Sequence, residues 1–199
     1  MNPVDIGKAY DQIAERWASN KFPHENGIEA HERAIALVGA KRHALDIGCG
    51  SSDRFIELFI AHRFKVEALD VSSRMVELAK QQHPDIPIYN TDIREWRFPR
   101  EYDLISAWDS IWHIPLNDQE KMLRRILKKL TAKGVYIFTT GGIDEPGEKV
   151  DSLMGPEMYY SSLGLPRTLD VISEAGCVCR HLEYDRFPEP HVYIIAQRG

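Results

Sequence analysis

Ala44-Leu45-Asp46-Ile47-Gly48-Cys49-Gly50-Ser51-Ser52 is the stretch that decides the fold of this 199-residue chain. Leu45 and Ile47 flank Asp46 as in a short buried strand, and two glycines one residue apart then allow a tight turn. Residues 51–53, two serines and an aspartate, can cap a following helix whose first turn exposes unpaired N–H groups. A strand, a glycine turn and a helix N-terminus together predict a nucleotide-binding site.

Two acidic residues indicate which kind of nucleotide this turn receives. Asp70 ends the next expected strand, near the roughly 20-residue offset at which an acid meets ribose hydroxyls. A dinucleotide fingerprint would need a third glycine at position 53, where the carboxylate of Asp53 would repel a pyrophosphate. A nucleoside without phosphates therefore fits this turn better.

At these residues the chain resembles the class I S-adenosylmethionine-dependent methyltransferases, whose first motif reads acid-x-G-x-G. The resemblance extends from about Tyr10 to Arg198, because the later elements recur in the expected order. It implies an α/β, Rossmann-like fold with seven strands in a mostly parallel sheet and helices on both faces. The implied strand order is 3-2-1-4-5-7-6 with strand 7 antiparallel, and the implied cofactor is S-adenosyl-L-methionine.

Helices alternate with strands along most of the chain. We expect helices near residues 4–19, 28–37, 54–61, 73–82, 118–130 and 166–175. We expect strands near residues 43–47, 64–71, 86–89, 102–108, 134–140, 178–184 and 191–197. The alternation predicts a parallel sheet covered on both faces. The last two strands are too close for a crossover helix and should form an antiparallel hairpin.

Residues 1–199 are expected to form a single domain. The N-terminal helices, within residues 1–40, would cover the cofactor cleft, with a loop near residues 22–27. Residues 141–163 are rich in glycine and proline and match neither a strand nor a clear helix. Their place after the fifth strand favours an acceptor-side flap over the carboxyl ends of the strands, and plain disorder is the alternative.

The composition bears on the partners and the compartment. A net charge of −5 gives no general attraction to nucleic acid. The cations within residues 121–129 interleave with apolar residues, as on a solvated helix face. No apolar run approaches the roughly 18 residues needed to span a bilayer, so no membrane partner is expected. Three cysteines argue against a disulfide framework, favour a reducing cytoplasm and lack metal-site spacing. Monomer and homodimer both stay open.

The resemblance assigns residues to the methionine and ribose ends of the cofactor. Asp46, Gly48 and Gly50 match the first motif, with Cys49 between the glycines, and this backbone would face the methionine part. Asp70 matches the acid that accepts hydrogen bonds from both ribose hydroxyls, and its alternative role is to cap the next helix.

The adenine end follows the second and third strands. Val71 and Met75 would pack on the adenine or ribose faces, or would otherwise be ordinary core residues. Asp92 resembles the acid that accepts from the adenine amino group, and Ile93 would supply a backbone N–H to the ring. A simple turn aspartate is the alternative for Asp92.

Aromatic residues are expected to close the cofactor pocket and to surround the reactive centre. Ala107 and Trp108 end the fourth strand beside the sulfonium. Tyr10 and Trp17, on the first helix, resemble positions with which family members close the pocket, and core packing is the alternative for Trp17.

The candidate catalytic residues are Asp109, His113 and Tyr160. Asp109 would hold an amine or hydroxyl acceptor, and His113 would take a proton from it or would instead bind backbone. Tyr160 and its neighbour Tyr159 would line the acceptor pocket, or only anchor the flap. Methyl transfer is an in-line displacement, in which alignment of the reacting atoms alone can lower the activation barrier by about 7–11 kcal/mol.

The sequence therefore predicts a methyltransferase that acts on a small-molecule acceptor. The base-methylating motif that some relatives carry after the fourth strand is absent, since residues 109–112 read Asp-Ser-Ile-Trp. Two alternatives stay open. The first is an S-adenosylmethionine-binding protein without catalysis. The second is an NAD-dependent oxidoreductase, which Asp53 and the antiparallel ending disfavour.

Overall fold

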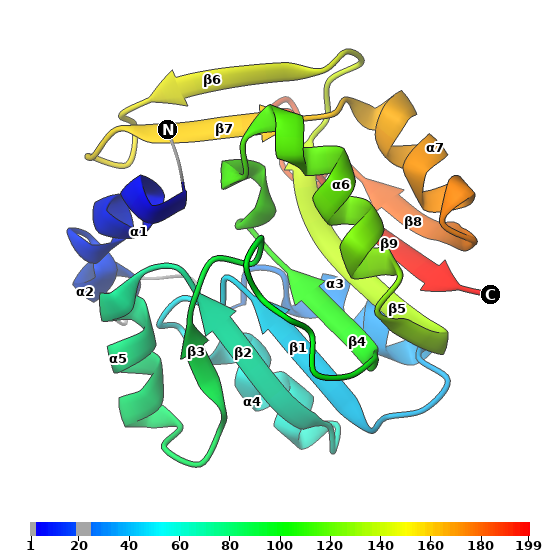
Figure 1. Cartoon of the computed structure of the whole chain (residues 1–199), viewed down its shortest axis with the longest axis horizontal. Coiled ribbons are helices and arrows are strands. Elements are labelled where there is room, and N and C mark those ends of the chain that lie inside the picture. The colour runs from blue at the N-terminus through cyan, green and yellow to red at the C-terminus, as the bar shows by residue number, and fades with distance from the viewer. Residues whose placement is uncertain (1–2, 19–24) are drawn as a thin grey trace.

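The computed structural model describes residues 3–18 and 25–199, so that residues 19–24, in the first expected helix and loop, lie outside it. Its elements follow in chain order (Figure 1): α1 (Pro3–Asp11), α2 (Ala14–Trp17), α3 (Ile28–Leu37), β1 (His43–Ile47), α4 (Arg54–Ala61), β2 (Lys65–Asp70), α5 (Ser73–Gln82), β3 (Ile88–Asn90), β4 (Tyr102–Ala107), the 3-10 helix η1 (Ile111–His113), α6 (Leu116–Leu127), β5 (Leu130–Gly141), β6 (Gly147–Asp151), β7 (Met158–Ser162), α7 (Leu165–Glu174), β8 (Cys177–Glu183) and β9 (His191–Arg198).

Seven strands form the main sheet in the order β3-β2-β1-β4-β5-β9-β8. Strands β1 to β5 run parallel to one another, whereas β9 runs antiparallel to both β5 and β8. The β5–β9 register runs from Val135 opposite Gln197 to Gly141 opposite His191. The predicted strand order and the predicted antiparallel ending are both confirmed. β8 and β9 are antiparallel because the chain between them is too short for a crossover.

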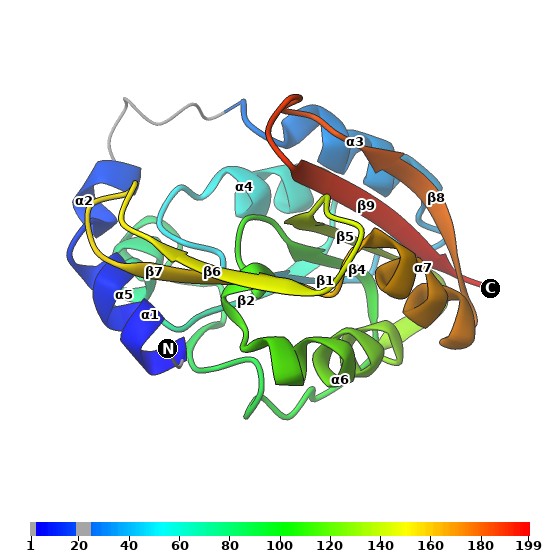
Figure 2. The same ribbon diagram turned by 90° about the horizontal axis from the view of Figure 1, so that it is seen from above.

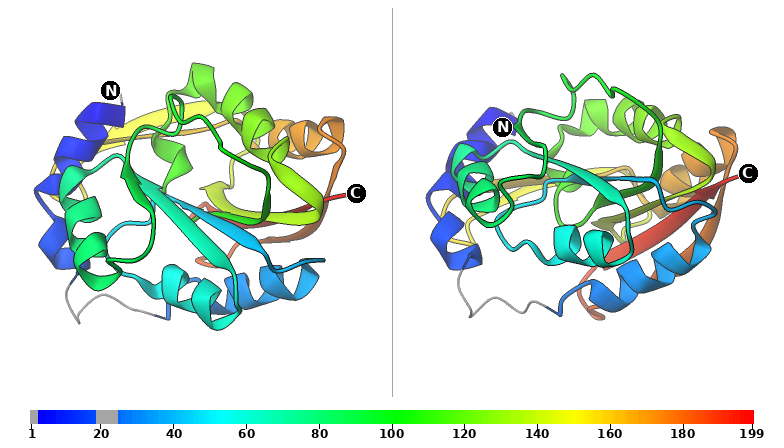
Figure 3. Two further views of the ribbon diagram at one scale, coloured as in Figure 1. Left: turned by 60° about the horizontal axis from the view of Figure 1, so that its bottom comes forward. Right: turned by 90° about the horizontal axis from the view of Figure 1, so that it is seen from below.

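Helices cover both faces of this sheet. α6 lies in front of it in Figure 1, and α3 and α4 lie side by side along the other face in Figure 3. Residues of α6 and α7 belong to one apolar cluster, and residues of α3, α4 and α5 belong to another. The sheet is therefore buried on both faces, as a parallel sheet requires.

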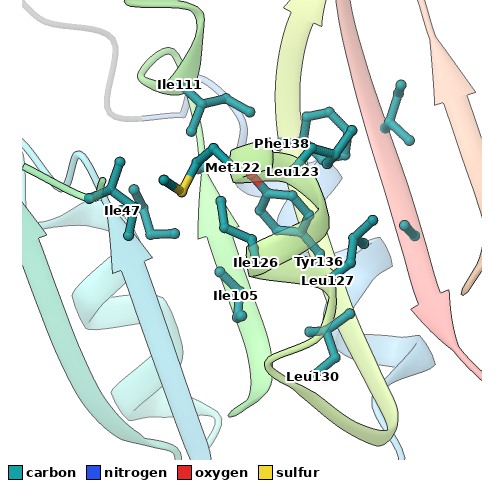
Figure 4. Packing of buried hydrophobic residues seen from close by; sticks show 14 of the residues in the cluster. Ile47, Ile105, Ile111, Met122, Leu123, Ile126, Leu127, Leu130, Tyr136 and Phe138 are labelled. Atoms are coloured by element: carbon teal, nitrogen blue, oxygen red, sulfur yellow. The ribbon is translucent and has the colours of Figure 1, made fainter. Parts of the chain in front are cut away.

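The cluster under α6 holds this helix against β4 and β5. Ile126 and Tyr136 are fully buried, and Figure 4 shows Ile126 pointing from α6 toward the strands beside Ile105. Burial of one such side chain stabilises the fold by about 1.5–3 kcal/mol. This packing fixes the end of β4, where the candidate catalytic residues begin.

The helix expected over residues 4–19 is divided, which corrects the prediction of one continuous helix. α1 ends at Asp11, residues 12–13 form a turn, and α2 begins at Ala14. The physical reason lies in tertiary contacts, because the Asp11 carboxylate binds the start of α5. Local spacing of apolar residues does not report such a contact.

The segment predicted as a flap, residues 141–163, was expected to form neither a strand nor a clear helix. That expectation is wrong, because the segment contains two strands. β6 and β7 form a two-stranded antiparallel sheet in which Gly147 lies opposite Ser162. Figure 2 shows this hairpin crossing above the main sheet next to α1. Met158 and Tyr159 are buried while Val150 is exposed, so contacts with the rest of the molecule stabilise the hairpin.

Two further expectations change at helix and strand ends. β5 begins at Leu130 rather than at residue 134, since Leu130 pairs with Tyr102 of β4. Asp53 takes the N-cap position of α4 with a φ of 49°, but its side chain caps none of the N–H groups of that described helix. Ser72, in contrast, caps α5, and its Oγ accepts from the Met75 N–H at 3.1 Å.

The longest described helix, α6, has 12 residues. A membrane-spanning helix needs about 20, and none in residues 3–18 or 25–199 meets that requirement.

Candidate active site

A cavity opens at the carboxyl ends of the parallel strands. Its wall brings together residues from α1, α2 and the segments that follow β1, β2, β3 and β4. The predicted site residues on this wall are Tyr10, Trp17, Gly48, Cys49, Gly50, Asp70, Val71, Met75, Asp92, Ile93, Trp108, Asp109 and His113.

The glycine turn between β1 and α4 forms the floor of the cavity. Gly48 has a φ of 73° and Gly50 has a φ of 60°, both in the left-handed region that favours glycine. A Cβ at Gly48 would lie 2.3 Å from the Cβ of Ser110, whereas a Cβ at Gly50 would meet none of the described atoms within 4 Å. The backbone is therefore packed closely against Ser110 at Gly48 and open toward the cavity at Gly50.

Asp70 connects this turn to the start of α5. Its Oδ2 accepts from the Gly50 N–H at 2.9 Å and its Oδ1 accepts from the Ser72 N–H at 2.8 Å. Burial raises the pKa of Asp70, although the backbone hydrogen bonds oppose that effect. Each carboxylate oxygen has a second lone pair, so Asp70 still has acceptor capacity toward the cavity.

Asp92 and Ile93 follow β3 at the far end of the cavity. Asp92 Oδ2 accepts from the Arg94 guanidinium at 2.8 Å, and Oδ1 accepts from the Arg94 backbone N–H at 2.9 Å. Arg94 also donates to Asp118 at 3.0 Å. Sequence reasoning did not single out Arg94, which fixes the orientation of the Asp92 carboxylate.

α1 covers the cavity and is fastened to α5. Asp11 Oδ1 accepts from Ser72 Oγ at 2.6 Å and from the Arg74 N–H at 3.0 Å. The carboxylate thus lies at a helix N-terminus, where a negative charge is stabilising. Gly7 approaches the chain so closely that a Cβ there would lie 2.7 Å from the Val71 carbonyl oxygen. Of the expected cover, α1 and α2 reach the cavity, whereas α3 packs beside α4.

Asp11→Ala is expected to loosen this cover, because α5 loses a carboxylate at its first turn. The expected cost is about 0.5–2 kcal/mol, the range for loss of a cap and a dipole interaction. Hydrogen exchange of the amides in α1 and α2 measures it. Lys8→Ala, an exposed change on the same helix, serves as the control. Unchanged exchange in Asp11→Ala would contradict the role assigned to this carboxylate.

His113 lies under α1 and the β6–β7 hairpin and contacts both. Its Nδ1–H donates to the Tyr159 carbonyl oxygen at 2.6 Å, and its Nε2 is 3.0 Å from the Tyr10 hydroxyl. The Trp112 indole N–H also donates to Nε2, at 3.2 Å. Burial lowers the pKa of His113 to about 4. His113 is therefore a neutral imidazole that holds both covering segments.

Three predicted residues lie outside the cavity wall. Asp46 is buried in β1, where desolvation raises its pKa to about 7 and a hydrogen bond from Ser106 opposes that rise. Ala107 is buried in β4. Tyr160 lies on β7, with its ring centroid 6.1 Å from that of Trp112 and 5.0 Å from that of His113.

Asp109 is held at the end of β4 by residues distant in sequence. It has a φ of 52°, and its N–H donates to Thr139 Oγ1 at 2.8 Å. Its Oδ1 lies 2.9 Å from His191 Nε2 on β9. His191 and Arg54, which lines the cavity from α4, were both missed by sequence reasoning. No local motif marks either residue, and only the two carboxylates that flank the histidine in space show its importance.

Comparisons with known proteins point to a methyltransferase domain. A family model described as a methyltransferase domain matches residues 44–134. A dTDP-4-amino-2,3,4,6-tetradeoxy-D-glucose N,N-dimethyltransferase from Saccharopolyspora spinosa is 28% identical over 123 residues, which are 54% of this chain and 49% of that protein. Malonyl-[acyl-carrier protein] O-methyltransferase 1 from Ilyobacter polytropus is 30% identical over 142 residues, 66% of this chain and 52% of that protein. The chain spans about half the length of these curated relatives.

A solved structure shows the same fold over nearly the whole chain. The S-adenosylmethionine-dependent methyltransferase from Clostridium acetobutylicum superposes with a TM-score of 0.70 at 14% identity, covering 98% of each chain. The strand order, the antiparallel β9 and the glycine turn facing Asp70 are the features that the family resemblance implies. Residues 44–134 therefore match a methyltransferase-domain family, and the chain as a whole has the fold of this solved methyltransferase.

Proposed function

We propose that this protein transfers a methyl group from S-adenosylmethionine to a small-molecule acceptor. The position of Asp70 carries the proposal. Its carboxylate lies in the wall of the cavity, and the N–H groups of Gly50 and Ser72 hold it there. A carboxylate in this orientation can accept hydrogen bonds from two neighbouring ribose hydroxyls.

The residues of the cavity suit this cofactor along its length. The open side of Gly50 leaves room for a ligand against the backbone, where a larger side chain would intrude. Met75 and Ile93 supply apolar surface at the adenine end, and Asp92 supplies an acceptor for an exocyclic amine. The cofactor itself would supply a methyl group activated by a positively charged sulfur. The protein would bind the cofactor, orient it toward the acceptor and exclude water.

Aromatic rings surround the end of the cavity that faces the acceptor. Trp108 lines it, and Trp112, His113 and Tyr160 form a contiguous ring cluster beside it. Such faces favour a cationic centre by about 0.5–2 kcal/mol. We assign Asp109 to the acceptor and His113 with Tyr160 to the wall that positions it.

A small acceptor is favoured by the charge of the chain and by the name of one of its relatives. The net charge of −5 offers no general attraction to nucleic acid. One curated relative is named for an amino sugar linked to a nucleotide. All three cysteines are free thiols, which suits the cytoplasmic location that we propose together with a monomeric or homodimeric state.

Tryptophan fluorescence tests the proposal, since Trp17 and Trp108 line the cavity. We expect saturable quenching by S-adenosylmethionine and by its demethylated product, and none by NAD. Incubation with labelled methyl donor and a polar metabolite extract should give a labelled small product. Quenching without any transfer would support a binding protein without catalysis, and quenching by NAD would support an oxidoreductase.

A further inference from the structure

His191 lies between two carboxylates beside the cavity. Its Nε2 is 2.9 Å from Asp109 Oδ1, and its Nδ1 is 2.5 Å from Asp185 Oδ1. Asp109 lines the cavity, His191 is only 6% exposed, and the side chain of Asp185, in the loop before β9, is 19% exposed. These three side chains therefore join the cavity to the surface.

The hydrogen bonds define the charge of this triad. Carboxylate oxygens only accept, so both ring nitrogens must carry hydrogen to satisfy both contacts. Burial lowers the pKa of His191, but the hydrogen bonds and charge of Asp109 and Asp185 outweigh it and raise the pKa above its ordinary value. Arg186 opposes this rise, and its guanidinium lies 3.5 Å from Asp109.

Two tryptophan rings pack around the imidazole of His191. The ring centroid of His191 is 6.1 Å from that of Trp108 and 5.4 Å from that of Trp112. The other charged group at this end of the cavity is Arg54 of α4. The titration of His191 is governed by Asp109, which follows β4, and by Asp185 and Arg186 from the loop before β9.

His113 is less suited to take a proton. Its Nε2 already accepts from two donors, the Tyr10 hydroxyl and the Trp112 indole N–H. Burial lowers its pKa to about 4, so at neutral pH it is a weak base. A base works best when its pKa lies near the operating pH, and His191 meets that condition better.

We propose that Asp109 takes the proton of the methyl acceptor and that His191 passes a proton on to Asp185 and solvent. This inference rests on the proposed methyltransferase function. The acceptor's lone pair forms the new bond to the transferred carbon, and the bonding pair of the broken carbon–sulfur bond stays on sulfur. The acceptor's proton moves to Asp109. His191 then accepts it at Nε2 while Nδ1 releases its own proton to Asp185.

The working form of His191 in this path is the neutral imidazole. Below its pKa, the imidazolium pairs with both carboxylates, and Nε2 cannot accept a proton. The rate should therefore rise with pH through the pKa of His191. Because Asp185 raises that pKa, Asp185→Asn should move the rising limb to lower pH.

Titration of the histidine ring nitrogens by NMR, in the ligand-free protein, tests the charge state. We expect His191 to stay doubly protonated above pH 6.5, its ordinary midpoint, and to titrate at lower pH in Asp185→Asn. Glu189→Gln, an exposed change in the same loop, should leave the midpoint unchanged. A wild-type midpoint at or below 6.5, or the same midpoint in Asp185→Asn, would overturn the proposal.

The pH dependence of methyl transfer tests the path itself, with labelled donor and the polar metabolite extract. His191→Gln should lower the rate about 100-fold, the low end for loss of general base catalysis, and should abolish the rising limb. A limb that persists in His191→Gln and disappears in His113→Asn would overturn the proposal. No transfer by the wild-type protein at any pH would overturn the proposed function and the proton path together. The NMR titration reports the charge of His191 alone, so a contrary result there would overturn the proton path and leave the proposed function standing.

Discussion

Asp70→Ala is expected to raise the dissociation constant for S-adenosylmethionine about 100-fold or more. Two charge-assisted hydrogen bonds to ribose hydroxyls contribute about 1.5–3 kcal/mol each, and every 1.4 kcal/mol is about tenfold in affinity. The variant also leaves the Gly50 and Ser72 N–H groups without their acceptor. Isothermal titration calorimetry, supported by tryptophan quenching, measures the change.

Two further variants separate loss of binding from loss of fold. Asp70→Asn keeps one carbonyl oxygen and should lose less affinity than alanine, with an unchanged circular dichroism spectrum. Asp85→Ala removes an exposed carboxylate in the turn before β3 and should bind like the wild type. Wild-type affinity in Asp70→Ala would remove the cofactor assignment of this cavity.

Gly48→Ala is expected to destabilise the protein by about 2–5 kcal/mol. The left-handed backbone costs an alanine about 1–2 kcal/mol, and overpacking adds about 1–3 kcal/mol. The overpacking arises because the new Cβ would lie 2.3 Å from the Cβ of Ser110. Urea unfolding measures the loss, and cofactor binding should be lost with it.

Two variants test whether the contact with Ser110 is the cause. Ser110→Gly in the Gly48→Ala background should restore part of the stability, because it removes the colliding Cβ. Gly50→Ala has a similar backbone penalty but no described neighbour within 4 Å. It should stay folded and lose cofactor affinity, since its methyl group enters the cavity. Equal destabilisation in Gly48→Ala and Gly50→Ala would contradict the steric argument.

The glycine turn and the place of Asp70 beside it could be predicted from the sequence because their signals are local. The turn at Gly48 and Gly50 needs residues that tolerate positive φ, and few residues besides glycine do so. Asp70 follows a strand at the distance that topology requires, and the sheet brings its carboxylate 2.9 Å from the Gly50 N–H. The strand order was implied by the resemblance to the methyltransferase family, and the antiparallel hairpin followed from one connection too short for a crossover.

The cover of the cavity was only partly predictable. The strands β6 and β7 are short and glycine-flanked, and they are stabilised by contacts of Tyr159 with η1 and with the start of α6. The break in the first helix likewise depends on Asp11 reaching α5. In both places a tertiary contact overrides local propensity, which a pattern of neighbouring residues cannot report.

The sequence by itself determined the sheet, the glycine turn and the acid that faces it, because these depend on backbone conformation and on residues close in the chain. Only the tertiary structure decided the chemistry at the acceptor end. It gave His113 two donors and a buried, neutral ring, and it placed His191 between Asp109 and Asp185. The proton affinity of a histidine is set by burial and by charges that folding brings near it.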